Sequence, residues 1–494
     1  MDDNDTVGEG VMHISKLLLM EPESSLNINN KSGNTVAEPE DSTTLYFDTD
    51  RNRVTYASSI TGGKTEVMTS VFDAVVAKDG GDYVSIADAF SNGKKSVFVR
   101  TGTYIETSDI IVPSGGRLIG ESISKATIIL AAGNSVRIHD ETRETSFGNI
   151  SISNGSSTVT GTGTNFATTG ITTGDYILIG NKYYPVVEVF DDTNLTIEDP
   201  YRGSDIVNKN YRVHKMNVAA QIQNIVIFGS SGPGLCLTRA YHTIVEDVLL
   251  SQNSPNLLIE NSGSIILRSI CNQNSKSQGM IIRDTHTINM TGNEVTNNIH
   301  DGINIQGSSS NIIIESSGIS NNGGSGIVIV DEADFITITD IIVTQNSEHG
   351  IITGLNSVSC TISDCNICKN AHTGITYGGS SNCATNCIIR ENGQHGIVVT
   401  AQAIISGCIV MGNVGNGIEI TGDRNSIQSN NIYQNMTHGV HVHGNHSIIV
   451  GNQIYDNLDV PIIIEADSNK VSLNNITGIS GIIDNGTNNY ILNN

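Results

Sequence analysis

Four ionisable side chains near position 440 are spaced so that they could act on the same ligand. His441 follows Glu419 by 22 residues, and Glu465 follows His443 by the same 22 residues. If 22 residues form one turn of a repeating coil, all four lie on one face, within about ten ångströms. A carboxylate beside an imidazole can act as base and acid, or the group can hold a divalent metal. A solvated polar face is the simpler interpretation; in an enzyme, these four are the predicted catalytic residues.

A second set of residues combines both charges. Glu260 and Arg283 occupy equivalent positions one period apart, and Arg239 and Asp284 lie one step further along. A cross-strand salt bridge is the simpler interpretation. An arginine beside acids can also bind an acidic sugar, so these four are the predicted substrate-binding residues. The sequence predicts no cofactor, and it does not single out metal ligands. The alternative to a protein without a cofactor is one that binds a divalent cation.

A sequence repeat of 21–24 residues places these side chains. Its markers are glycines that in most repeats precede Ile or Val: Gly279, Gly302, Gly326, Gly350, Gly374, Gly396, Gly417 and Gly439. In eight repeats, the last of which has Pro461 as its marker, an asparagine stands four residues before the marker. These are Asn298, Asn322, Asn346, Asn370, Asn392, Asn413, Asn435 and Asn457. A β-branched residue stands seven before each marker of these eight repeats. A period in this range is typical of a solenoid.

The apolar residues within each repeat alternate with polar ones, as in Ile418-Glu-Ile420, and Gly, Asn and Ser separate the short runs. This pattern favours strands over helices. The sequence therefore predicts an all-β fold, a right-handed single-stranded parallel β-helix of 21–24 residues per rung. We expect the asparagines to stack as a ladder in the left-handed backbone region, and the glycines to supply a turn angle. His349, His395 and His438 precede marker glycines and are expected to be exposed turn residues.

The composition narrows the class of protein. The chain has 494 residues, a net charge of -24 and no tryptophan. This charge argues against a nucleic-acid partner and against adhesion to anionic membranes. The acidic N-terminus is unlike a secretory leader, and no run of residues is long and apolar enough for a transmembrane segment, so we expect no signal peptide and no membrane insertion. Cys365, Cys387 and Cys408 share one column and are expected to be stacked, reduced thiols.

The segments outside the repeat suggest four parts. Residues 1–70 contain a hairpin-like centre with a turn at 50–52 and form the N-terminal segment. Residues 71–146 contain an amphipathic helix at 85–90 and the first rungs. Residues 147–216 break the repeat and read as an inserted small antiparallel β-domain. Residues 217–494 form the main β-helix.

The helix followed by DIIVPSGGRLIGES resembles the N-terminal entry of pectin-lyase-like β-helix proteins, in which the helix caps the coil. The inserted GTGTNF…GDYILIG segment and the hairpin resemble parts of phage tailspikes and virion-surface appendage proteins. These resemblances imply a location on a virion surface, attachment to other virion proteins through residues 1–70, a homotrimer, and a polysaccharide or cell-surface glycan as ligand.

The pectin-lyase-like resemblance leaves three functions open, because this fold serves many activities. The first is a virion-surface or tailspike-like appendage that contacts host-cell glycans. The second is a polysaccharide lyase, hydrolase or epimerase acting on an acidic glycan. The third is a structural fibre without a ligand. The sequence lacks the D-P-H run of alginate epimerases and the NTD…DD…GHG…RIK set of polygalacturonases, which weakens the second.

Overall fold

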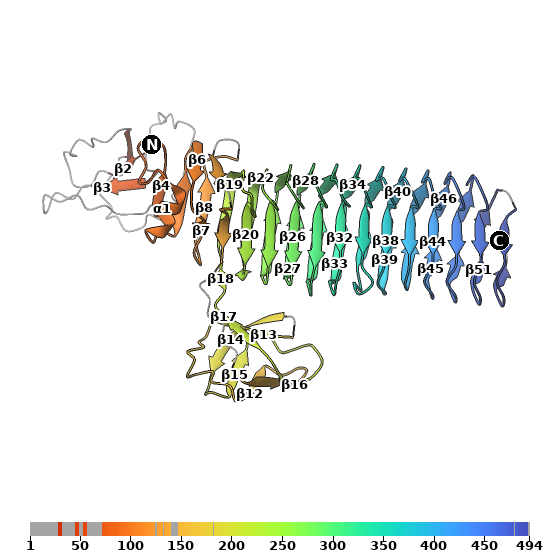
Figure 1. Ribbon diagram of the computed structural model, residues 1–494, viewed down its shortest axis with the longest axis horizontal. Helices are drawn as coiled ribbons and strands as arrows, with labels where there is room; N and C mark the ends of the chain where they lie inside the picture. Colours follow the sequence, from red (N-terminus) through yellow and green to blue (C-terminus); the bar gives the residue numbers. More distant parts are fainter. Residues whose placement is uncertain are drawn as a thin grey trace, which may run out of the picture.

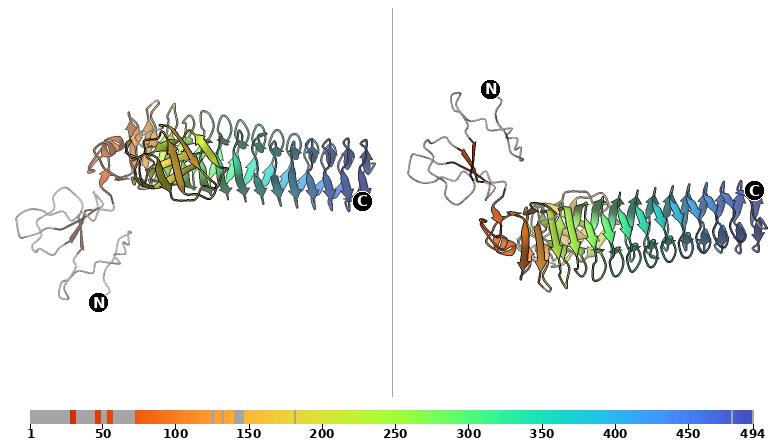
Figure 2. Two further views of the ribbon diagram at one scale, coloured as in Figure 1. Left: turned by 90° about the horizontal axis from the view of Figure 1, so that it is seen from below. Right: turned by 90° about the horizontal axis from the view of Figure 1, so that it is seen from above.

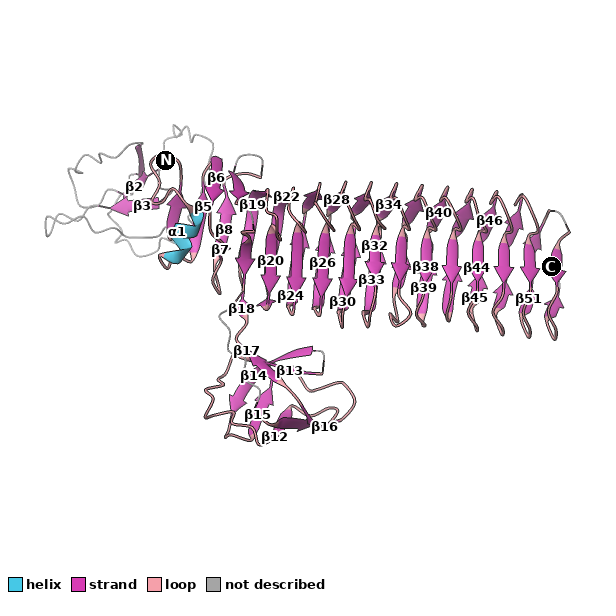
Figure 3. Cartoon of the chain, viewed as in Figure 1, coloured by secondary structure: helices cyan, strands magenta, loops and turns pink. Residues whose placement is uncertain are grey.

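The chain forms a long coil of short strands with a smaller β-lobe beside its N-terminal end (Figure 1). The computed structural model describes residues 28–31, 45–48, 53–56, 72–123, 126–131, 133–139, 147–180, 182–478 and 480–492. Figure 3 shows how strands dominate these residues. The predicted fold class, an all-β parallel β-helix with an inserted antiparallel sheet, is confirmed.

One wall of the coil is a 14-stranded parallel sheet, called here the 14-strand sheet. Its strands, in chain order, are β7 (Ile110–Ile111), β10 (Val136–Ile138), β20 (Leu235–Thr238), β23 (Leu257–Glu260), β26 (Met280–Arg283), β29 (Ile303–Gln306), β32 (Ile327–Ile329), β35 (Ile351–Thr353), β38 (Ile375–Tyr377), β41 (Ile397–Val399), β44 (Ile418–Ile420), β47 (Val440–Val442), β50 (Ile462–Ile464) and β53 (Ile482–Asp484). Each pairs in register with the strand one rung on, so side chains in one column stack along the axis.

The other strands of each rung belong to a larger parallel assembly, from β4 (Ala74–Val76) to β54 (Tyr490–Leu492). The rung that begins at β35 continues through β36 (Thr361–Ser363) and β37 (Asn366–Cys368). Apolar side chains from all three strands of each rung point inward and form one continuous core along the coil. Burial of these Ile, Val and Leu side chains is the main force that holds the rungs together.

The asparagine ladder lies inside the coil, and every member is buried. The side-chain amide of each asparagine donates to Oδ1 of the next, at 2.9–3.1 Å, from Asn298 through to Asn457. The same Oδ1 also accepts the backbone N–H of the preceding ladder asparagine. The left-handed backbone conformation that we expected at the asparagines occurs one residue before them, as at Lys369 with φ 57°. That part of the prediction is therefore wrong.

The marker glycines stand where there is no room for a side chain. A Cβ on Gly350 would lie 2.5 Å from the carbonyl oxygen of Gly374 and 2.6 Å from Cγ2 of Ile367. Gly350 itself does not have a positive φ. The expectation that these glycines supply a turn angle is therefore wrong: the rungs approach too closely for a side chain. The stacking of Cys365, Cys387 and Cys408 is confirmed, because all three are buried and each directly precedes a strand that pairs in register with the next. Their reduced state stays a prediction.

A short helix, α1 (Ile86–Ser91), lies at the N-terminal end of the coil (Figure 3). Ser85 is its N-cap and accepts a hydrogen bond from the backbone N–H of Asp88, which is a favoured arrangement at helix starts. The buried carboxylate of Glu106 accepts from Ser85 Oγ at 2.8 Å and from the backbone N–H of Ile86 at 2.6 Å. A carboxylate at this end is stabilised by the free N–H groups of the first turn.

The inserted lobe is a seven-stranded antiparallel sheet with its own core. Its strands are β11 (Asn149–Ile152), β12 (Thr158–Thr162), β13 (Tyr176–Ile179), β14 (Lys182–Val189), β15 (Asn194–Ile197), β16 (Ile206–Lys209) and β17 (Arg212–His214). Tyr176, Tyr183 and Met216 pack against Val218 and Tyr241 at its junction with the coil. Figure 2 shows the lobe over the N-terminal rungs from two further sides.

Three strands precede the coil: β1 (Ile28–Lys31), β2 (Leu45–Asp48) and β3 (Arg53–Tyr56). β2 and β3 pair in antiparallel fashion, as the expected hairpin requires, and β1 pairs in parallel with β2. The turn expected at 50–52 lies outside the described residues. Among the helices that the structure describes, none is long and apolar enough to cross a membrane.

Candidate functional site

The structure brings the four predicted catalytic residues together on the solvent side of the 14-strand sheet. Glu419 in β44 and His441 in β47 are direct partners in the strand register. His443 follows β47, and Glu465 follows β50, where its N–H donates to the carbonyl of Val442 at 2.8 Å. We call Glu419, His441, His443 and Glu465 the Glu–His cluster. Three consecutive rungs therefore supply its side chains.

Each imidazole of the Glu–His cluster lies between the two carboxylates. Nδ1 of His441 is 3.3 Å from Oε2 of Glu419, and Nε2 of His443 is 3.0 Å from Oε1 of the same residue. On the other side, Nε2 of His441 and Nδ1 of His443 lie 3.5 and 3.1 Å from Oε2 of Glu465. The two rings are tilted to each other with centroids 4.0 Å apart.

Partial burial makes these charges interact strongly. The side chains of Glu419 and His441 are 13% and 16% exposed, against 42% for Glu465. Burial alone would raise the pKa of Glu419, but His441 and Asn416 outweigh it, so the pKa lies below its usual value. Burial alone would lower the pKa of His441, but Glu419 and then Glu465 outweigh it, so the pKa is raised. The pair therefore favours an ionised carboxylate beside a protonated imidazole.

Asn416 is a site residue that the sequence reasoning missed. Its Nδ2 donates to Oε2 of Glu419 and lies 3.4 Å from Nδ1 of His441. Its Oδ1 accepts hydrogen bonds from Oγ1 of Thr437 and the backbone N–H of His438, which fixes the orientation of the amide. Its position in the repeat is the signal that could have found it. Asn416 directly precedes the marker Gly417, and the outward-facing Glu419 stands three residues after Asn416.

The histidines before the marker glycines are half-buried, so the expectation that they are exposed is wrong. Nδ1 of His395 accepts the backbone N–H of Asn416 at 3.1 Å. Burial, opposed by the charge of Glu419, lowers the pKa of His395. The ring of His438 lies 5.3 Å from that of His441. Both histidines therefore border the Glu–His cluster.

This arrangement offers two kinds of chemistry. An ionised carboxylate beside a protonated imidazole can accept one proton and supply another. Glu419, His441 and His443 also present one ligand atom each within 4.8 Å of one another, which makes them candidate ligands of a divalent metal. The catalytic role of the cluster stays a prediction.

The structure divides the four predicted substrate-binding residues. Nη1 of Arg283 forms a 2.6 Å ion pair with Oε1 of Glu260. With the amide of Gln306 oriented to suit, its oxygen accepts from Nη2 and Nε of Arg283 at 2.7 and 2.9 Å. Asp284 accepts the backbone N–H of Ser308 at 3.0 Å. These contacts favour the cross-strand ladder for Glu260 and Arg283, and the substrate-binding role stays a prediction.

Arg239, the fourth predicted substrate-binding residue, faces the inserted lobe. Its Nη1 lies 3.5 Å from Nδ1 of His214. A cavity of about 170 Å³ lies at this junction, lined by Tyr183, Arg212, His214, Thr238, Arg239 and Asn261. Pockets between domains are common ligand sites, and two arginines favour an anion.

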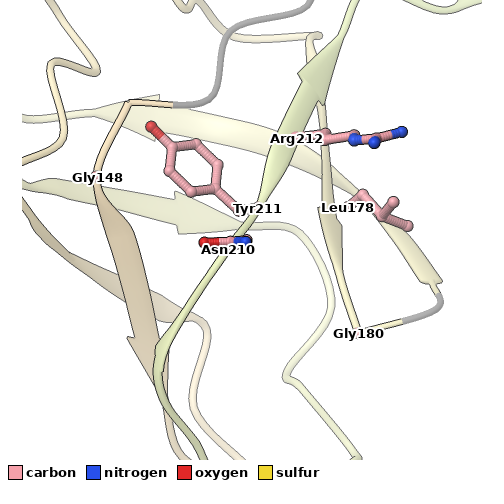
Figure 4. Close-up of a pocket in the computed structure, with 6 residues that line it drawn as sticks. All are labelled: Gly148, Leu178, Gly180, Asn210, Tyr211 and Arg212. Atoms are coloured by element: carbon pink, nitrogen blue, oxygen red, sulfur yellow. The ribbon is translucent and has the colours of Figure 1, made fainter.

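A larger cavity of about 360 Å³ lies at the inserted lobe, lined by Gly148, Leu178, Gly180, Asn210, Tyr211 and Arg212 (Figure 4). Figure 4 shows Tyr211 and Arg212 directed to different sides of the chain. The hydroxyl of Tyr211 donates to the carbonyl of Phe147 at 2.9 Å. Arg212 is the one charged residue of this lining, so the cavity lacks the paired acid and base found at the Glu–His cluster.

Known proteins share this architecture. The tailspike protein gp49 from Pseudomonas phage LKA1 gives a TM-score of 0.54 at 14% identity, over 81% of this chain and 74% of that chain. The tailspike gp61 of Pseudomonas phage phi297 gives 0.52 at 13% identity, over 80% and 73%. The A-module of the Azotobacter vinelandii mannuronan C-5 epimerase AlgE6 gives 0.46 at 14% identity, over 82% and 93%.

The two tailspikes, with TM-scores above 0.5, share the fold of this chain, and identities this low show nothing about activity. A comparison with curated proteins gave no match. Residues 212–358 and 352–494 match the family described as the right handed beta helix region, which together is more than half of the chain. The chain therefore belongs to the right-handed β-helix family.

Proposed function

We propose that this protein is a β-helix appendage of a virion surface, of tailspike type, that contacts host-cell glycans through its 14-strand sheet. The observation that carries the proposal is the Glu–His cluster: two carboxylates and two imidazoles converge on the outer face of a rigid sheet. Polar groups fixed on a rigid sheet can bind sugar hydroxyls with little loss of side-chain entropy. The fold shared with two phage tailspikes supports this proposal.

The second candidate is an enzyme that cleaves or modifies an acidic polysaccharide. It is favoured by the opposite pKa shifts of Glu419 and His441, because general acid–base catalysis needs two groups in different protonation states. In this case the half-buried Glu419 is the base and the protonated His441 is the acid.

One experiment separates these functions. The full chain is incubated with a panel of acidic and neutral polysaccharides, and the same samples are assayed for retained binding, new reducing ends and absorbance of unsaturated uronates. Binding without products supports the appendage, and products that disappear in Glu419→Gln and His441→Ala support the enzyme. His349→Ala, in an earlier rung, is the matched control and should leave both readouts unchanged. If the chain neither binds a polysaccharide nor releases products, a structural fibre is the function that remains.

Assembly on the virion is part of the same proposal. Residues 1–70 would attach the chain to other virion proteins, and three copies would associate as a homotrimer, as a rod with an adaptor at its base allows. Light scattering coupled to size-exclusion chromatography should give three times the 52.5 kDa mass of one chain. A chain lacking residues 1–70 should lose binding to virions while keeping its β-structure.

A further inference from the structure

The donor atoms of the Glu–His cluster match the ligands of a borderline divalent metal. His441 and His443 are two residues apart at the end of β47, so both rings emerge on one face of the sheet. Register places Glu419 beside His441. Two imidazoles and one carboxylate form one of the ligand sets that hold zinc in proteins. We propose that Glu419, His441 and His443 bind one Zn²⁺ ion, an inference that goes beyond glycan contact and does not depend on it.

The spacing of the ligand atoms fits a tetrahedral ion. Zinc bonds to nitrogen and oxygen are about 2.0–2.2 Å long, so ligand atoms at the corners of a tetrahedron are about 3.3–3.6 Å apart. Nδ1 of His441 lies 3.3 Å from Oε2 of Glu419, and Nε2 of His443 lies 3.0 Å from Oε1, the other oxygen of the same carboxylate. All three ligand atoms lie within 4.8 Å of one another. Rotation of the partly buried side chains has to bring the two imidazole nitrogens to this tetrahedral spacing.

Glu465 is placed to orient the imidazoles. The nitrogens that face away from Glu419, Nε2 of His441 and Nδ1 of His443, both approach Oε2 of Glu465. A neutral imidazole carries one N–H, and a proton on the Glu465 side leaves the lone pair on the Glu419 side. Carboxylates commonly hold metal-binding histidines in this way. Asn416 has a parallel role, because its Nδ2 donates to Oε2 of Glu419.

The donor atoms also discriminate between ions. Calcium and magnesium prefer oxygen ligands in sets of six or more, whereas two of the three ligands here are nitrogens. Three protein ligands leave the fourth tetrahedral position for water.

The test uses the full chain, treated with EDTA and desalted, and zinc sulfate as the probe. Isothermal titration and metal analysis after gel filtration should give one Zn²⁺ per chain. Glu419→Gln and His443→Gln should each abolish this stoichiometric binding, and Glu465→Gln should weaken affinity by about 10–100-fold. His349→Gln changes a histidine in the His349–His372 pair of an earlier rung and should bind zinc normally.

A second measurement does not depend on the folding of any variant. Cobalt sulfate added to the unaltered chain should give the intense visible absorption of a four-coordinate Co²⁺ ion, which one equivalent of Zn²⁺ removes. The proposal is overturned if the chain retains no zinc after gel filtration, or if cobalt gives only the weak spectrum of the hydrated ion. Zinc affinity that is unchanged in both Glu419→Gln and His443→Gln also overturns it.

Discussion

Replacing Asn370 with alanine should destabilise the coil by several kilocalories per mole. Oδ1 of Asn370 accepts the backbone N–H of Asn346 at 3.1 Å and its side-chain Nδ2 at 2.9 Å. After the substitution, both of these buried donors lose that acceptor, and Nδ2 of Asn346 keeps only the carbonyl of Ile319 at 3.4 Å. An unsatisfied buried donor costs about 1–3 kcal/mol, so two donors cost about 2–6 kcal/mol. This is a large part of a typical stability of about 5–15 kcal/mol.

Urea denaturation followed by far-ultraviolet circular dichroism measures this loss, and hydrogen exchange at the amide of Asn346 tests its cause. The amide should exchange much faster in Asn370→Ala, because its acceptor is gone. Asn321→Gly is the matched control: Asn321 is exposed, with φ 54°, a conformation that glycine adopts readily. Its effect should stay within about 0.5 kcal/mol. A loss below about 1 kcal/mol in Asn370→Ala, with exchange unchanged, would refute the reasoning.

Three further predictions concern the site, the glycines and the inserted lobe. Because the pKa of His441 is raised, its contribution to stability is complete below the usual value of 6.5 and is lost as pH rises through the folded pKa. The pKa of Glu419 is lowered, so its contribution is present above 4.5 and lost as pH falls through the folded pKa. The melting-temperature difference between the unaltered chain and a Glu419→Gln, His441→Gln variant should therefore be largest at about pH 4.5–6.5; a difference independent of pH would contradict this. Gly350→Ala should lose roughly 1–3 kcal/mol in urea denaturation through overpacking, whereas Gly232→Ala, whose Cβ would meet nothing closer than 3.6 Å, should lose little; equal losses would contradict this. Tyr241→Ala removes a ring 4.6 Å from Tyr176 and should speed proteolytic release of the inserted lobe without loss of coil strands. Unchanged cleavage would show that other contacts hold the lobe.

The columns of the repeat were sufficient to predict the coil, its core and the meeting of Glu419 with His441. A parallel register carries residues of one column to the same face in every rung, so spacing alone places them. The same argument brought His443 and Glu465 to that face. Spacing also predicted the cysteine ladder, because inward positions stack as regularly as outward ones.

Features that depend on three-dimensional contacts could not be read from the columns. The side chain of Asn416 reaches across a turn to Glu419, and its position in the repeat does not determine the rotamer that makes this contact. Arg239 meets His214 because the inserted lobe folds back over the coil, a contact between segments that no repeat relates. The marker glycines were assigned to turn geometry because the sequence does not show how closely neighbouring rungs approach.

The asparagine ladder gives the coil an electrical direction. Every side-chain bond in it runs from Nδ2 of one rung to Oδ1 of the next rung toward the C-terminus. Amide dipoles aligned head to tail add together and polarise one another, whereas those of a sheet backbone largely cancel. The positive end of this buried row is Asn457. The interior of the rod is thus a polar axis that keeps one direction from rung to rung.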